Sequence, residues 1–174
     1  MSEQDDGGMP PGGDTAEMLE ARDSEVLATL EPKMRAAMKL REEGKDAAAE
    51  TLLRAILRGE PRLAEPRLEL AHILAVRGAW ADAQEQARMA VDILRNGGQW
   101  TDDVGPNALL SFALNLQGEV QVRELEEGDL FLVDKEEFTQ LWNGASVLFT
   151  EACELDGDNE DARRNRTRYR ALEG

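Results

Sequence analysis

Residues 64–97 read AEPRLELAHILAVRGAWADAQEQARMAVDILRNG, and this stretch decides the fold. Apolar residues recur every three to four positions on both sides of Gly78, which indicates two amphipathic helices joined by a short turn. Gly78 is suited to end the first helix, because glycine adopts the left-handed backbone conformation without a penalty from Cβ. The predicted apolar stripes are Leu70, Ala71 and Leu74 on the first helix and Ala83, Ala87 and Ala90 on the second.

The same pattern occurs earlier in the chain. Gly44 precedes Gly78 by 34 residues, and Ala49 and Ala83 each follow their glycine by five. A period of about 34 residues is the length of one helix–turn–helix unit in a helical repeat protein. The stripes predicted for this first copy are Ala36, Ala37 and Leu40, followed by Ala49, Leu53 and Ile56. A third second-helix pattern appears much later, at Ala145, Phe149 and Ala152, and ends on the turn-forming residues 156–159.

These three copies resemble the tetratricopeptide repeat family over about residues 30–172. The chain departs from the family pattern at two positions. Ile56 replaces the last alanine of the first copy, and in the second copy Arg95 stands where the family usually has a proline. The resemblance implies an all-α, right-handed α-solenoid, and members of such families bind other proteins.

One helical domain is expected. Residues 1–14 are rich in Gly, Pro and Asp and predict a disordered acidic tail. The expected domain covers residues 15–174: a leading helix at 15–30, repeats at about 30–63, 64–97 and 106–159, and a capping helix at 160–172.

The third repeat departs from the pattern. A first helix is expected from Pro106, with Gly118 as its cap. Residues 120–125 then alternate apolar and polar side chains, and a second apolar run, 130–133, follows a turn-rich stretch. This pattern favours a small β-hairpin at about 119–133. The alternative extends the helix to Leu125 and leaves a loop before a helix that starts with the capping pair Asp134 and Glu137.

Charge and composition narrow the classes of ligand and compartment. The net charge is −16, and residues 1–31 hold nine acids against Arg22 alone, which argues against nucleic acid or an anionic membrane as ligand. No apolar run is long enough to span a bilayer, and the first residues lack the features of a secretion signal. Cys153 is expected to be a buried, inert thiol. A cytoplasmic protein is the expectation.

Enzymatic chemistry is not expected. His72 is the only histidine, and we therefore expect neither a catalytic triad nor a multi-histidine metal site. Residues 156–161 resemble the start of a calcium loop, but Asp161 and Thr167 stand where that loop needs glycine and glutamate. No cofactor or metal is therefore predicted.

A groove on the first helices is the predicted partner-binding site. The resemblance places the ligand-facing positions there, and the Met/Leu character of this set differs from the basic clamp with which related repeats hold acidic chaperone tails. An amphipathic helix or an extended segment with apolar anchors would suit it, unless the leading helix covers the groove. The groove residues are Met34, Met38, Arg41, Leu68, His72, Val76, Leu110 and Leu114.

Two further surfaces are candidates. The first is the apolar side of the predicted hairpin, with Val120, Val122, Leu130, Phe131 and Leu132. The second is a basic patch, with Arg163, Arg164, Arg166, Arg168 and Arg170. We interpret the patch as the polar outer face of a capping helix, with Ala162, Tyr169 and Leu172 facing inward. The alternative is a binding site for an acidic segment, such as the N-terminal tail of this chain.

Three hypotheses of function follow. The first is an adaptor or scaffold that holds a partner segment in the apolar groove. The second is a small acidic chaperone for secreted or membrane-active clients. The chain resembles the chaperones of type III secretion translocators in size, charge and layout. The third is a structural subunit that docks through the edge of the predicted hairpin at 120–133. The sequence leaves the partner and the oligomeric state open.

Overall fold

The computed structural model describes residues 16–98, 104–128 and 134–172, and these residues contain helices and no strand. The all-α prediction is therefore confirmed for the described part of the chain. The helices are α1 (Ala16–Glu42), α2 (Asp46–Gly59), α3 (Glu65–Val76), α4 (Trp80–Arg95), α5 (Pro106–Glu127), α6 (Lys135–Leu155) and α7 (Glu160–Arg168).

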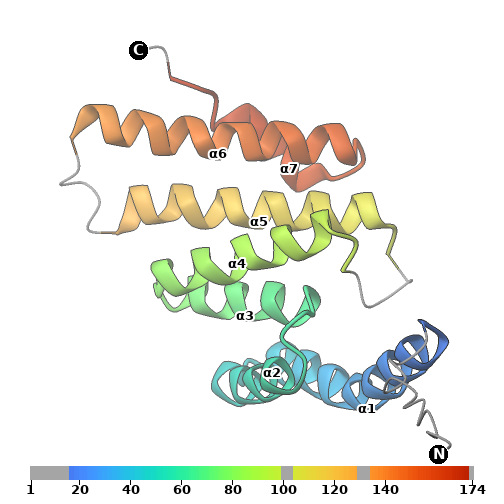
Figure 1. Ribbon diagram of the computed structural model, residues 1–174. Helices are drawn as coiled ribbons and strands as arrows, with labels where there is room; N and C mark the ends of the chain where they lie inside the picture. The colour runs from blue at the N-terminus through green and yellow to red at the C-terminus, as the bar shows by residue number, and fades with distance from the viewer. Residues whose placement is uncertain (1–15, 99–103, 129–133, 173–174) are drawn as a thin grey trace, which may run out of the picture.

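The helices pack in the order in which they follow one another along the chain. Each contacts the next, and α3 and α7 additionally contact α5. Figure 1 shows the resulting stack, with α1 and α2 at one end and α6 and α7 at the other. The first and last described helices therefore lie at opposite ends of the molecule.

The two turn glycines have the predicted conformation. Gly44 and Gly78 have φ values of 71° and 75°, in the left-handed region. Backbone N–H groups of Lys45 and Ala79 reach back to the carbonyls of Leu40 and Leu74, at 2.8 and 2.9 Å. These bonds satisfy carbonyls at the ends of α1 and α3 that have no partner within the helix.

Alanine lines the crossings between the helices. Ala49, Ala71, Ala83, Ala87 and Ala90 are fully buried, as the sequence pattern predicts. Their small side chains let the helix backbones approach closely, and the leucines beside them fill the remaining space. In the first copy, the inward-facing alanine is Ala37, whereas Ala36 is exposed.

The boundary predicted near residue 30 falls inside α1. A single helix covers both the expected leading helix and the first helix of the first copy, with Pro32 inside it. Leu27, Leu30, Met34 and Ala37 form one continuous stripe that packs on the core on both sides of this proline. Pro32 lacks the N–H of a normal helical residue, but it is exposed and the stripe does not depend on it.

The hairpin prediction is wrong. Residues 120–125 belong to α5, which continues to Glu127, so the alternative interpretation of a longer helix is confirmed. Val120, Val122 and Leu125 are buried in this helix. Their alternation imitated a strand because α5 is covered on more than one side, by α4 and α6. Leu130, Phe131 and Leu132 lie outside the described residues.

Gly118 is not the cap of a helix but lies in the interior of α5. A Cβ atom at this position would lie 2.6 Å from Cε1 of Phe149, so α5 and α6 pass each other very closely there. Phe149 itself is fully buried and stacks on Tyr169, with 5.6 Å between the ring centroids. The missing side chain of Gly118 is therefore part of the packing of the third helix pair.

The ends of α6 and α7 follow the capping rules. Asp134 Oδ1 accepts a hydrogen bond from the backbone N–H of Glu137 at 2.9 Å, as the capping pair predicts. Asn159 Oδ1 accepts one from the N–H of Ala162 at 3.0 Å at the start of α7. Each bond satisfies an N–H group that has no partner within its helix.

Gly118→Ala is expected to destabilise the protein by about 1–2 kcal/mol, because the added methyl group overpacks the buried ring of Phe149. This cost outweighs the gain in helix propensity of about 1 kcal/mol that alanine has over glycine. Urea unfolding followed by circular dichroism measures the difference.

Gly59→Ala, at the last residue of α2, is the matched control, because a Cβ there has no neighbour within 4 Å. This variant is expected to be unchanged or up to about 1 kcal/mol more stable. If the two alanine variants were equally stable, the close passage of α5 over α6 would be disproved.

Candidate functional site

Helices α1, α3 and α5 present part of their surfaces on one side of the stack. An ion pair between Arg41 and Glu69 joins α1 to α3, and α3 contacts α5 directly. Between α3 and α5 lies a hollow of about 30 Å³. We call this side the first-helix face; it comprises Met38, Arg41, Glu69, His72, Val76, Phe112, Leu116, Glu119 and Arg123.

The helical period explains which residues reach this face. On α3, Glu69, His72 and Val76 are three and four positions apart, and all other residues from 66 to 75 are buried. On α5, Leu116 and Glu119 line the hollow, and Phe112 lies one turn before Leu116. Each helix therefore contributes one stripe, and the stripes run side by side.

Three large apolar side chains of this face are exposed. Val76 is 62% exposed, Phe112 48% and Met38 43%, and they come from α3, α5 and α1. Charged side chains of both signs lie between them, including Glu119 and Arg123 at the hollow. Exposed apolar groups gathered between polar ones are a common property of protein-binding surfaces.

The structure separates the predicted groove residues into two groups. Met34, Leu68 and Leu114 are buried and belong to the core, and Leu110 is half-buried against it. Met38, His72 and Val76 are exposed on the first-helix face, and Arg41 is half-exposed there in its ion pair. The exposed apolar surface is therefore narrower than a continuous Met/Leu strip.

Phe112, Glu119 and Arg123 are residues of this face that the sequence interpretation missed. The sequence interpretation instead placed Leu110 and Leu114 in the groove, and the structure buries Leu114 and half-buries Leu110. The spacing of Phe112, Leu116, Glu119 and Arg123, at four, three and four residues, is the signal that could have identified them.

Glu69 is the most buried carboxylate of this face. Burial raises its pKa, since the charged form loses hydration, while the nearby charges of Arg41 and His72 act in the opposite direction. Its side chain is only 18% exposed, and the ion pair with Arg41 joins α1 to α3 beside the hollow. The relative position of these two helices thus depends in part on a charge that the protein keeps away from water.

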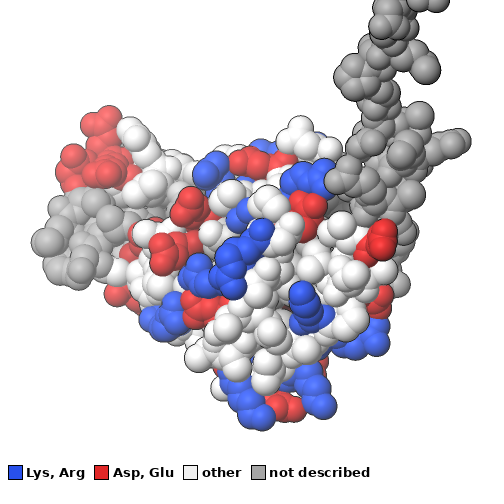
Figure 2. Space-filling model, turned by 60° about the horizontal axis from the view of Figure 1, so that its bottom comes forward, with Lys and Arg blue, Asp and Glu red and all other residues white. Residues whose placement is uncertain are grey.

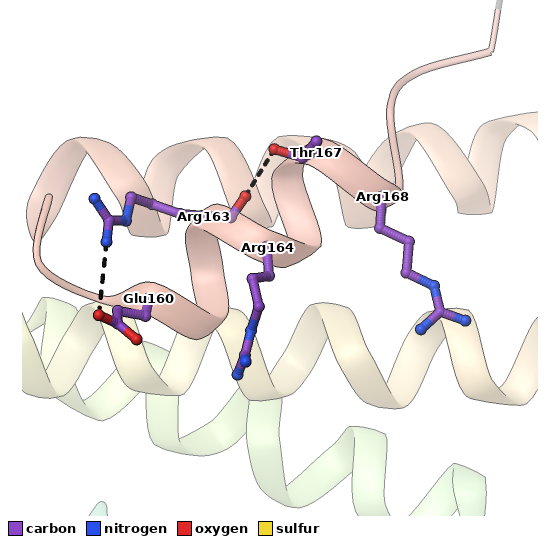
Figure 3. A pocket seen from close by; sticks show the side chains of 5 residues that line it. All are labelled: Glu160, Arg163, Arg164, Thr167 and Arg168. Atoms are coloured by element: carbon purple, nitrogen blue, oxygen red, sulfur yellow. Dashed lines mark hydrogen bonds and ion pairs between the residues drawn. The ribbon is translucent and has the colours of Figure 1, made fainter.

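The basic patch lies on and just beyond α7, at the end of the stack opposite to α1 (Figure 1). All five arginines are exposed, as are Glu160 and Asp161, which form ion pairs with Arg163 and Arg164. Ala162 and Tyr169 face inward as predicted, but Leu172 is exposed. Figure 3 shows Arg164 and Arg168 extending in one direction from successive turns, while Arg163 turns toward Glu160.

Polar contacts fix α7 against α5. Ser111 Oγ accepts a hydrogen bond from Asn159 Nδ2 at 2.9 Å. Asn165 Nδ2 donates to Asn115 Oδ1 at 2.9 Å and to Glu119 Oε1 at 2.7 Å. Because Ser111 and Asn115 are buried, these bonds must all be made at once, and they hold α7 in one position.

The described residues contain no cluster of metal-binding side chains and no exposed thiol. Within them, no group of three or more His, Cys, Asp or Glu side chains is arranged to hold a metal ion. Cys153 is buried, as expected. None of the described helices combines the length and the hydropathy that a membrane span requires.

Comparison of the chain with models of known protein families gives no match, and comparison with curated proteins gives none either. The surfaces described above therefore carry the functional argument.

Arg41→Ala is expected to destabilise the protein by about 1 kcal/mol near neutral pH, because it leaves Glu69 without its cation. The pKa of Glu69 should then rise further above its value in the unfolded chain. At pH values between the unfolded and folded pKa of Glu69, the folded state binds more protons than the unfolded state. The contribution of Glu69 to the free energy of unfolding therefore increases as pH falls. The deficit relative to the parent protein should therefore shrink in mild acid, as urea unfolding at several pH values measures.

The double variant Arg41→Ala with Glu69→Gln is the control, because it removes the titrating carboxylate of Glu69. Its stability relative to the parent should lack the recovery in acid that Arg41→Ala shows. A deficit of Arg41→Ala that is constant with pH would contradict the role assigned to Glu69.

Proposed function

We propose that this chain is a non-enzymatic protein-interaction module, a tetratricopeptide-like solenoid that binds a segment of a partner protein on the first-helix face. The observation that carries the proposal is the exposure of Met38, Val76 and Phe112 on three different helices, with Val76 at the hollow between α3 and α5. Folding leaves these three side chains in water although the same helices bury most of their other large apolar residues. A ligand that covers them would remove the free-energy cost of exposing apolar surface.

The shape of the face favours a polypeptide ligand. A hollow of about 30 Å³ accepts one small side chain but is far smaller than the pockets of several hundred Å³ that enclose cofactors. The apolar groups are spread over α1, α3 and α5, so a ligand that touches all of them must run across the stack. A helix or an extended segment with apolar residues on one side has that shape.

The charges of the face favour a ligand that carries both signs. Glu119 and Arg123 border the hollow, and the Arg41–Glu69 pair joins α1 to α3. A segment with an apolar centre and oppositely placed charges at its flanks would match this arrangement. Such charges set the orientation and the partner, while the apolar contacts contribute most of the affinity.

Val76→Glu combined with Phe112→Glu is expected to weaken partner binding at least about tenfold, because two charges replace the apolar groups that the ligand covers. Both side chains are largely exposed, so circular dichroism and the unfolding midpoint should change little. The measurement is affinity purification from the native cells with mass spectrometry, followed by titration calorimetry with the recovered protein.

Val147→Glu is the matched control, since Val147 is 64% exposed on α6 and away from the first-helix face. A specific partner should be recovered with the parent chain and with this control, but not with the double variant. Equal recovery with all three chains would show that the first-helix face is not the binding surface.

A further inference from the structure

The charge of this chain is divided unevenly between its two ends. Residues 160–170 hold five arginines against Glu160 and Asp161, a net charge of +3 in a chain whose total is −16. Residues 1–24 hold seven acids against Arg22, a net charge of −6. The seven acids are Glu3, Asp5, Asp6, Asp14, Glu17, Glu20 and Asp23.

The basic end is open to a ligand. Arg163, Arg164, Thr167 and Arg168, together with Glu160, line a wide depression on α7 that faces solvent. Arg164 and Arg168 extend from it in the same direction, as two neighbouring cations on successive turns (Figure 3). Paired guanidinium groups are well suited to carboxylates, with which they form charge-assisted hydrogen bonds.

The surface near α1 and α2 differs from α7. On the side of the molecule that Figure 2 shows, basic and acidic side chains alternate. Ion pairs between neighbouring residues also occur on α2 and α4, such as Arg54 with Glu50 and Arg88 with Asp92. Two arginines of α7 are paired in the same way, but five arginines against two acids leave residues 160–170 with a net positive charge that attracts an acidic segment.

A second copy can supply the acidic segment more completely than the same copy can. Glu17, Glu20 and Asp23 belong to α1, at the opposite end of the stack from α7 (Figure 1), so they cannot reach α7 of their own chain. A neighbouring molecule can bring these three acids to α7 together with the rest of the segment.

We propose that this protein associates head to tail, with the acidic segment 1–24 of one copy bound to the basic face of α7 in the next. The contact joins two different surfaces, so two associated molecules leave one acidic segment and one α7 free, and the chain of molecules can grow. It uses neither Val76 nor Phe112, and the first-helix face stays open for a partner. Association is driven by charge, and salt weakens it because exposed charges are screened.

Sedimentation analysis over a range of protein concentrations tests the proposal. At low salt the weight-average mass should rise with concentration above the 19.3 kDa of one chain, and at high salt it should return to that value. Arg164→Glu with Arg168→Glu should weaken association at least about tenfold. Arg58→Glu with Arg88→Glu, on α2 and α4, changes the total charge equally and should associate like the parent.

Mixing two charge-reversed chains identifies the surfaces. The Arg164→Glu, Arg168→Glu chain should be monomeric alone, and so should a Glu17→Lys, Glu20→Lys chain. Their mixture should associate, because the unchanged acidic segment of the first chain meets the unchanged basic α7 of the second. A parent chain that stays monomeric at low salt, or a mixture that fails to associate, would overturn the proposal.

Discussion

Close approach of helix backbones is the constraint on which this structure depends. Ala71, Ala83, Ala87 and Ala90 are fully buried where α3 and α4 pack, and Gly118 takes the same role between α5 and α6. Larger side chains at these crossings would clash with the neighbouring helix, so the positions require small residues. The exposed stripes of α1, α3 and α5 follow from this packing, because it fixes which side of each helix faces away from the core.

The repeat pattern made the first two helix pairs predictable, since the turns after Gly44 and Gly78 and the buried alanines are local features. The β-hairpin was a wrong prediction because Val120 and Val122 are buried on different sides of one helix, which depends on neighbours that the sequence does not name. The groove positions expected in the third repeat have no turn glycine to fix their register, because Gly118 lies inside α5. Of these positions, Leu114 is buried and Leu110 is half-buried.

The two candidate surfaces differ in chemistry and are linked by Glu119, which lines the hollow and accepts a hydrogen bond from Asn165 of α7. The first-helix face offers exposed apolar groups with charges of both signs, and α7 offers arginines at the end of the stack. They meet through α5, which carries Phe112 on one side and Asn115, the partner of Asn165, on another. The polar contacts that hold α7 thus place a basic surface beside an apolar one without merging them.

Packing in chain order also has a consequence for how the protein forms. Each helix contacts the next one along the chain. The other contacts between helices are mainly those of α5 with α3 and with α7. Chains of this type close only short loops as they fold, so the entropy lost before each favourable contact is small. Folding can start at any helix pair and spread to its neighbours, and the α5–α6 pair, with the longest adjacent helices and the Phe149–Tyr169 stack, is suited to be such a starting point.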